Sequence, residues 1–162
     1  MTVIYVDADA CPVREEIYRV AGRLGVTVHL VSNGSRPFRP PGLPFVLMQS
    51  VPDGADAADD WIVARIQPDD VCVTTDIPLA ARCLALGARA VAPNGRVWTA
   101  DNIGNALAGR EVARHLREIG AMTGGPAPLA KADRSKFLSA LDTAVTAALR
   151  QKPALERPGR PS

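Results

Sequence analysis

The feature that most constrains the fold is a regular alternation of short β-branched segments with amphipathic helical segments. Strands are predicted at 2–6, 26–31, 45–48, 71–75 and 89–92, with a short hairpin arm at 97–99. Helices are predicted at about 12–24, 55–66 and 78–86. Two more are predicted from an N-cap at Asp101 to about 119 and from an N-cap at Asp133 to 149. Strands that alternate with helices are typical of a mainly parallel sheet with helices on both faces. The sequence therefore predicts an α/β fold.

The length and the charge distribution indicate one domain followed by a tail. A chain of 162 residues suffices for a single domain, which we place at 1–150. Residues 151–162 include three prolines and are predicted to be a disordered basic, Pro-rich tail. The net charge is +2, but from Arg150 onward there are four basic residues and one acid, so residues 1–149 carry 15 basic against 16 acidic side chains. The body is therefore slightly acidic, and its stretch from Asp53 to Asp76, with seven acids and one base, would repel a phosphate chain unless a cation is bound there.

The start of the chain and its apolar runs favour a cytoplasmic protein. The chain opens directly on a strand-like segment, without the basic region and cleavage site of a signal peptide. No apolar run reaches the roughly 18 residues that cross a bilayer. The three cysteines lack metal-ligand spacing, and we expect them to be reduced. Cys11 precedes a predicted helix, but no histidine accompanies it, so a structural role is favoured over a catalytic thiol.

Acidic side chains follow two of the predicted strands. Asp7 and Asp9 come after the first strand, and Asp76 comes directly after the strand at 71–75. In parallel sheets, ligands bind beyond the carboxyl ends of the strands. If these two strands are neighbours, the acids surround one crevice. The helix between them adds three more acids in its first turns, namely Asp56, Asp59 and Asp60.

Such a cluster is typical of a site for a hard divalent cation. Several carboxylates repel one another, and a divalent cation removes that cost. Oxygen ligands favour Mg²⁺ or Mn²⁺ over Zn²⁺, and neither histidine lies near these motifs. The matching chemistry is phosphodiester hydrolysis by a metal-activated water. Structural roles remain open for single acids: Asp9 as a helix cap, and Asp56 and Asp59 as favourable charges at a helix N-terminus. Asp69 and Asp70 are predicted to form a solvated turn.

Four arginines are candidates for holding a substrate phosphate. Arg36 and Arg39 lie in a loop rich in Asn, Gly and Pro, Arg110 begins a basic helical stripe, and Arg134 follows a predicted cap. A solvated helix face explains the stripe equally well, and Arg134 is also placed to pair with an acid. Aromatic residues make up only 4% of the chain, so Trp61 is predicted to pack in the core and not to stack on bases.

Three motifs resemble one known family. They are DADACP at 7–12, GADAADDWI at 54–62 and TDIPLA at 75–80, and they look like signature blocks of the bacterial YaiI/YqxD family. The resemblance covers about residues 1–150. This family is itself similar to PIN-like nuclease domains, which implies a three-layer fold with a mainly parallel five-stranded sheet of order 3-2-1-4-5. It also implies that Mg²⁺ or Mn²⁺ is bound by acids after strands one and four and by one helix acid, which Asp56, Asp59 or Asp60 could supply.

Three hypotheses about function follow. In the first, the chain is a Mg²⁺- or Mn²⁺-dependent nuclease or phosphodiesterase acting on RNA or another phosphodiester. Asp7 and Asp76 are then the catalytic residues and principal ligands, and Asp9, Asp56, Asp59 and Asp60 are further ligands. In the second, the chain is a non-catalytic RNA-binding or regulatory module that retains the acidic site. In the third, which fits least well, it is a haloacid-dehalogenase-type phosphatase with Asp7 as nucleophile. The oligomeric state stays open.

Overall fold

A computed structural model describes most of the chain. It covers residues 2–8, 11–33, 41–52, 56–118 and 130–156, with side chains described only as far as 109 in the fourth range and 150 in the last. The strands are β1 (Val3–Asp7), β2 (Thr27–Ser32), β3 (Val46–Ser50), β4 (Val71–Val73), β5 (Arg89–Val91) and β6 (Val97–Trp98). The helices are α1 (Arg14–Leu24), α2 (Ala57–Val63), α3 (Ile77–Ala85), α4 (Ala100–Glu118) and α5 (Lys131–Glu156).

The strands form one sheet of order β3-β2-β1-β4-β5-β6. The pairs from β3 to β5 are parallel, and only β6 is antiparallel to its neighbour. The predicted α/β class and the order 3-2-1-4-5 are confirmed. The sheet has six strands and not five, because the predicted hairpin arm pairs with β5 and adds an edge strand. β1 and β4 are neighbours, as the hypothesis of a shared crevice requires.

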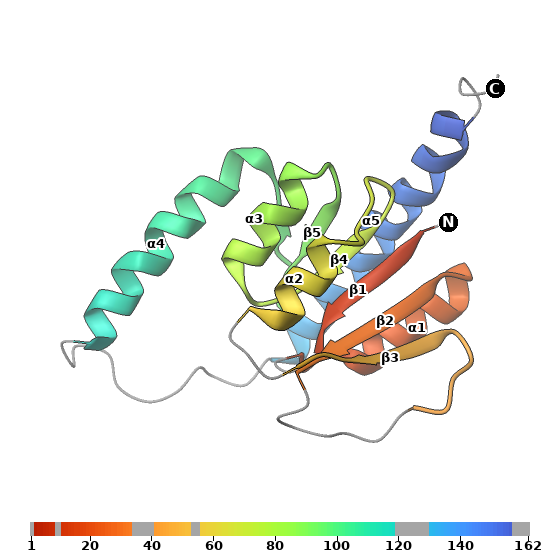
Figure 1. Cartoon of the computed structure of the whole chain (residues 1–162), viewed down its shortest axis with the longest axis horizontal. Helices are drawn as coiled ribbons and strands as arrows, with labels where there is room; N and C mark the ends of the chain where they lie inside the picture. The colour runs from red at the N-terminus through yellow and green to blue at the C-terminus, as the bar shows by residue number, and fades with distance from the viewer. Residues whose placement is uncertain (1, 9–10, 34–40, 53–55, 119–129, 157–162) are drawn as a thin grey trace.

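The sheet is the middle layer of three (Figure 1). Helices α1 and α5 pack on one face around fully buried residues such as Ile4, Val6 and Phe137. Helices α2 and α3 cover the other face, around Tyr5 and Cys72. Because successive side chains of a strand point to opposite faces, Asp7 lies on the same face as Tyr5. The end of β1 therefore presents its carboxylate on the face that α2 and α3 cover.

Several helix boundaries differ from the predictions because other residues provide the caps. Thr99, and not Asp101, caps α4: the Asn102 amide donates to the Thr99 hydroxyl, and the Thr99 amide donates to the Asn102 side chain. At α5, the Arg134 amide donates to the Ala130 carbonyl, so Asp133 lies inside the first turn. Pro12 lies before α1, which begins at Arg14.

Helix α5 is described as far as Glu156, inside the segment predicted to be a tail, and residues 157–162 lie outside the described residues. One further prediction, of a solvated turn at 69–70, was wrong for a physical reason. Asp69 and Asp70 are buried and not solvated. The Asp70 carboxylate accepts hydrogen bonds from the backbone amides of Val3 (2.9 Å) and Gln67 (2.8 Å). Among the helices that the structure describes, none is both long and apolar enough to cross a membrane.

Candidate functional site

One hydroxyl connects the acids at the ends of β1 and β4. The two strands pair with Val6 opposite Val73, so Asp7 and Thr74 are the next residues along. The Thr74 hydroxyl donates to Asp7 Oδ2 at 3.1 Å, and the backbone amide of Asp76 donates to Thr74 Oγ1 at 2.9 Å. Thr74 is buried, so these bonds are shielded from water. The structure thus brings Asp7 and Asp76 to one place, as their positions after the strands predicted.

Asp76 also forms the beginning of α3. Its backbone is extended, and its Oδ1 accepts a hydrogen bond from the Leu79 amide at 3.0 Å. Pro78 stands in the first turn, where a missing N–H costs nothing. The cap fixes the orientation of the Asp76 carboxylate and commits one of its oxygens. This side chain therefore has a structural role whatever else it does.

Asp59 is the helix acid that faces this pair. The pKa of Asp59 is raised from 3.8 to about 7, mainly by burial and then by the charges of Asp76, Asp7 and Asp56, in that order, while Arg82 acts to lower it. Asp60 lies elsewhere: its Oδ1 forms an exposed ion pair with the Arg82 guanidinium at 3.1 Å. Asp56 is exposed at the start of α2, and its side chain makes no capping bond.

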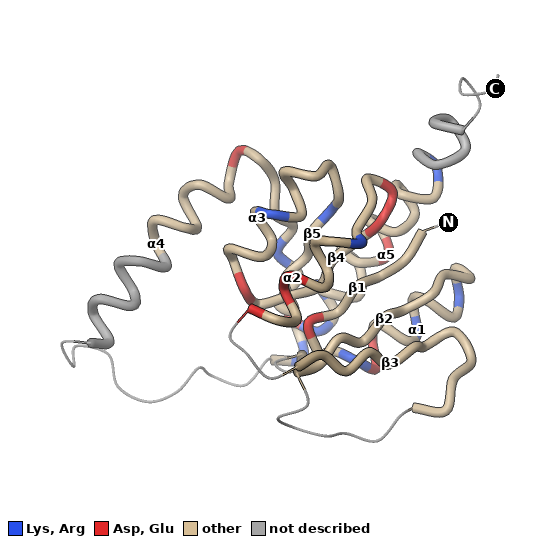
Figure 2. Tube along the Cα trace, viewed as in Figure 1, with Lys and Arg blue, Asp and Glu red and all other residues tan. Residues whose placement is uncertain are grey.

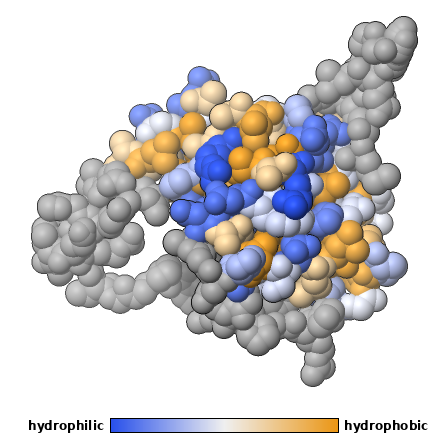
Figure 3. Space-filling view, in the orientation of Figure 1, coloured by the Kyte–Doolittle hydropathy of each residue, from blue (hydrophilic) through white to orange (hydrophobic). Residues whose placement is uncertain are grey.

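Asp7, Asp76 and the acids of α2 lie near the carboxyl ends of β1 and β4, on the face of the sheet that α2 covers. In Figure 2, acidic residues gather around α2 and near the ends of the central strands. The space-filling view shows hydrophilic side chains across the middle of the same face (Figure 3). Arg82 was not predicted from the sequence; it is the only basic residue at 77–86, and it lies beside this cluster. The ion pair of Arg82 with Asp60 joins α3 to α2, and no local sequence motif predicts a contact between these two helices.

Other predicted site residues are not part of this cluster. Asp9, Arg36 and Arg39 lie outside the described residues, and the Arg110 side chain is not described. Arg134 forms an ion pair with Glu16 (3.6 Å) and donates to the Pro12 carbonyl (2.8 Å), in agreement with its expected pairing with an acid.

Two other sequence expectations concern residues near the site. Trp61 is partly buried and packs beside Tyr5 and His29, with the Arg65 guanidinium 4.0 Å from its ring centre, in agreement with the expected packing role. Burial raises the pKa of Cys11 to about 11. A thiol that ionises so reluctantly is a poor nucleophile, which agrees with a structural role.

The acid cluster fits a hard cation by its chemistry. Its donors are carboxylate oxygens, and a cation would offset the repulsion that helps to raise the pKa of Asp59. Within the part of the chain that the structure describes, no three His, Cys, Asp or Glu side chains stand close enough together to hold a metal ion. Binding would therefore require the carboxylates to adjust or a ligand from outside the described residues.

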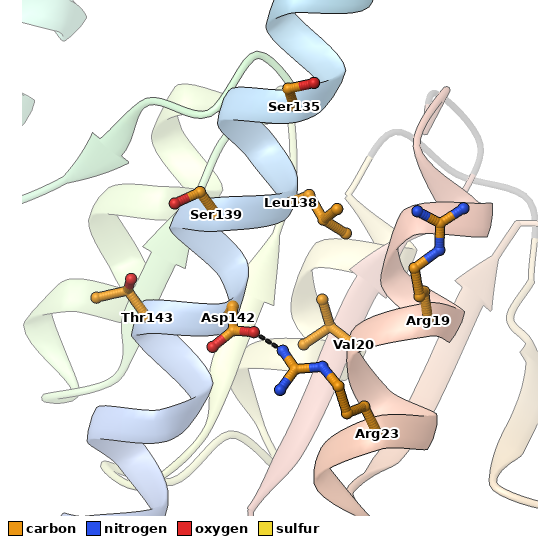
Figure 4. A pocket seen from close by; sticks show the side chains of 8 residues that line it. All are labelled: Arg19, Val20, Arg23, Ser135, Leu138, Ser139, Asp142 and Thr143. Atoms are coloured by element: carbon orange, nitrogen blue, oxygen red, sulfur yellow. Dashed lines mark ion pairs between the residues drawn. The ribbon is translucent and has the colours of Figure 1, made fainter.

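A pocket on the opposite side of the molecule contains none of these acids. It lies between α1 and α5 and is bordered by an ion pair between Arg23 and Asp142 (Figure 4). Three small hydroxyl side chains of α5, Ser135, Ser139 and Thr143, also line it. The pocket is thus separate from the candidate site.

The raised pKa of Asp59 leads to a prediction about the folding stability of the metal-free protein, measured with EDTA in the buffer. Because the folded protein binds this proton more tightly than the unfolded chain, stability falls as pH rises from about 4 to about 7. Asp59→Asn removes the cost of keeping an ionised carboxylate buried beside other acids. We expect the variant to be more stable by about 1 kcal/mol at about pH 8, a value reduced for partial solvent exposure, and equal to wild type near pH 4. Urea unfolding at both pH values measures this, with Asp60→Asn as control. A gain that does not depend on pH would contradict it.

Comparison with known proteins gives one consistent result. The family described as "Uncharacterized BCR, YaiI/YqxD family" matches residues 5–147. UPF0178 protein amb2838 of Paramagnetospirillum magneticum is 54% identical over 153 residues, which cover 94% of this chain and 100% of the relative. A UPF0178 protein of Parvibaculum lavamentivorans is 52% identical over 94% of this chain and 99% of its own length. No solved structure gives a significant match.

Proposed function

The chain belongs to the YaiI/YqxD family, and on that premise we propose that it is a Mg²⁺- or Mn²⁺-dependent phosphodiester hydrolase acting on nucleic acid. The observation that carries the proposal is the link from Asp7 through the Thr74 hydroxyl to the Asp76 amide, at the ends of two adjacent parallel strands. Ligands bind at such strand ends in open α/β sheets. The strand order 3-2-1-4-5 within the sheet agrees with the order that the PIN-like resemblance implies.

Each residue has a defined part in the proposal. Asp7, Asp59 and Asp76 would hold the cation after their carboxylates move closer together, with Asp9, outside the described residues, as a further ligand. When bound, the cation would lower the pKa of a water and offset the negative charge that develops on the phosphodiester. Thr74 orients Asp7 through its hydroxyl, and the cap of α3 orients Asp76. Arg82 holds Asp60 in an ion pair.

The same contacts support a second candidate, a binding module that lacks turnover. Asp7 and Asp76 already accept hydrogen bonds from Thr74 and Leu79, and these bonds stabilise the ends of β1 and β4 and the start of α3 without any catalysis. Such a module would bind RNA and would melt at a higher temperature when Mg²⁺ is added. In either case we place the protein in the cytoplasm, where its free cysteines would stay reduced.

A direct assay separates the two candidates. The full chain is incubated with MnCl₂ or MgCl₂ and with single-stranded RNA, single-stranded DNA or bis(p-nitrophenyl) phosphate. We expect hydrolysis of at least one substrate, its loss in EDTA and its return when Mn²⁺ is restored. Metal-dependent melting without turnover on any of the three substrates would overturn the proposal in favour of the binding module.

A further inference from the structure

Arg82 is the basic side chain that stands beside the acid cluster. From residue 53 to residue 86 the sequence has seven acids and only two bases, Arg65 and Arg82. The Arg65 guanidinium lies 4.0 Å from the ring centre of Trp61 and donates to the Trp61 carbonyl. Arg82 of α3 instead pairs with Asp60 of α2, the sequence neighbour of Asp59. Arg82 is therefore the cation of this stretch that is placed to meet a substrate at the acids.

The Arg82 side chain reaches the cluster from the last turn of α3. Asp76 caps this helix, and Arg82 stands six residues further on, about 9 Å along the helix axis. Helical side chains lean toward the N-terminus of their helix, so Arg82 extends back toward the end that carries Asp76. Its Nη1 lies 3.1 Å from Asp60 Oδ1, and its charge acts to lower the pKa of Asp59. The guanidinium thus lies next to the three proposed metal ligands without being one of them.

The ion pair uses only part of the guanidinium. Among the described residues, Arg82 forms a hydrogen bond with Asp60 alone, through Nη1. The two side chains are 45% and 65% exposed. A pair that water reaches so freely contributes little to stability, so its partner can be exchanged at low cost. A phosphate can accept two parallel hydrogen bonds from a guanidinium, and it therefore competes well for Arg82.

We propose that Arg82 binds a phosphate of the substrate and that Asp60 occupies the guanidinium until the substrate displaces it. This role rests on the proposed function, since it places a phosphodiester at the acids. Arg82 supplies a contact that the acids cannot make, because carboxylates repel a phosphate. Asp60 is then a competitor of the substrate and not a metal ligand.

The first measurement is the binding of a short fluorescein-labelled single-stranded RNA, followed by anisotropy in CaCl₂, with the RNA checked on a gel to be intact. We expect Arg82→Gln to raise Kd about tenfold and to reduce the steepness of log Kd against log salt concentration by about 0.7, the value for one phosphate contact on a single strand. Arg82→Lys should keep the steepness and raise Kd about threefold, because lysine keeps the charge but not the paired donors. An unchanged Kd and salt dependence in Arg82→Gln would overturn the proposal.

Asp60→Asn decides between substrate binding and a purely structural ion pair. Removal of the competing carboxylate should lower Kd about threefold, since the guanidinium is then open to the RNA. In the Arg82→Gln background the same substitution should leave Kd nearly unchanged, because the group that Asp60 occupies is gone. Weaker binding in Asp60→Asn would show that the pair only joins α2 to α3, and an equal gain in both backgrounds would show a general charge effect. Either result would overturn the exchange.

Arg65→Gln is the matched control for the loss of one positive charge near α2. Its guanidinium lies on Trp61, so this variant should keep the wild-type Kd and salt dependence. Urea unfolding of all variants should give similar stabilities, because both arginines are exposed. A loss of RNA binding in Arg65→Gln equal to that in Arg82→Gln would overturn the assignment to Arg82.

The second measurement is hydrolysis in MnCl₂. Arg82→Gln should raise KM about tenfold and change kcat little, because a contact made equally in the bound substrate and the transition state affects KM alone. A loss confined to kcat would overturn a role in holding the substrate. If wild type binds RNA with the expected variant effects but hydrolyses nothing, the proposed function fails and the role of Arg82 in binding stands. If wild type hydrolyses bis(p-nitrophenyl) phosphate but binds no RNA, the proposed hydrolase stands and the role of Arg82 fails.

Discussion

Asp7→Asn is expected to reduce metal-dependent phosphodiester hydrolysis about a thousandfold or more, because a cation at this site supplies several kcal/mol of charge stabilisation. The substitution keeps an amide oxygen that can accept the hydrogen bond from the Thr74 hydroxyl, now 3.1 Å from Asp7 Oδ2. It removes the negative charge that would bind the cation. The fold should therefore survive while the activity is lost.

The measurement is kcat/KM with Mn²⁺, together with circular dichroism and the unfolding midpoint of the same preparations. Asp76→Asn should give a similar loss, with a modest decrease in stability because a carboxylate caps α3 better than an amide beside the helix dipole. Asp101→Asn, at an exposed position on α4, serves as the control and should leave the rate unchanged. If Asp7→Asn keeps wild-type activity, Asp7 is not a metal ligand in the reaction.

The second large effect concerns stability and not activity. Asp70→Ala is expected to lower the free energy of unfolding by about 2–4 kcal/mol. Asp70 is only 2% exposed, and its two oxygens satisfy the amides of Val3 and Gln67, at the start of β1 and in the turn before β4. Alanine would leave both amides without this partner, in a place that water reaches poorly. Because β1 lies in the middle of the sheet, the loss should appear in global unfolding.

Urea unfolding followed by tryptophan fluorescence measures this loss. Asp70→Asn should give a smaller decrease, since its amide oxygen can still accept one of the two bonds while its NH₂ group faces the other donor. The residual Mn²⁺-dependent activity of the folded fraction should be close to wild type in both variants. A loss below about 0.5 kcal/mol in Asp70→Ala, typical of a surface substitution, would show that the two amides find other partners.

The parallel sheet could be predicted because it depends on local patterns and a general topological rule, whereas the strand order 3-2-1-4-5 came only from the resemblance to PIN-like domains. Alternating strands and helices indicated a parallel sheet. Because Asp7 and Asp76 each directly follow a strand, their side chains were expected to lie at one crevice if those two strands are neighbours. The sequence left the choice among Asp56, Asp59 and Asp60 open. In the structure, Asp60 pairs with Arg82, whereas the charges of Asp76 and Asp7 act on Asp59, which is why the proposal uses Asp59.

What could not be predicted depends on contacts between distant segments. Asp70 resembled a solvated turn residue, since nothing near it in the sequence shows that the Val3 amide reaches its carboxylate. The bridging role of Thr74 needs the register between β1 and β4, which no motif encodes. The cap of α4 was assigned to Asp101 because aspartate is a good capping residue, but Thr99 and Asn102 provide a reciprocal pair.

The short β6 strand has a consequence for behaviour at high concentration. Open sheets can pair edge to edge with other molecules, which leads to aggregation. At one edge of this sheet β6 contributes only Val97 and Trp98, so it offers few backbone groups as a template for another chain. The opposite edge, β3, is longer and exposes Leu47 (46%) and Met48 (40%). Intermolecular strand pairing would therefore start at β3, and a lysine in place of Leu47 should reduce self-association.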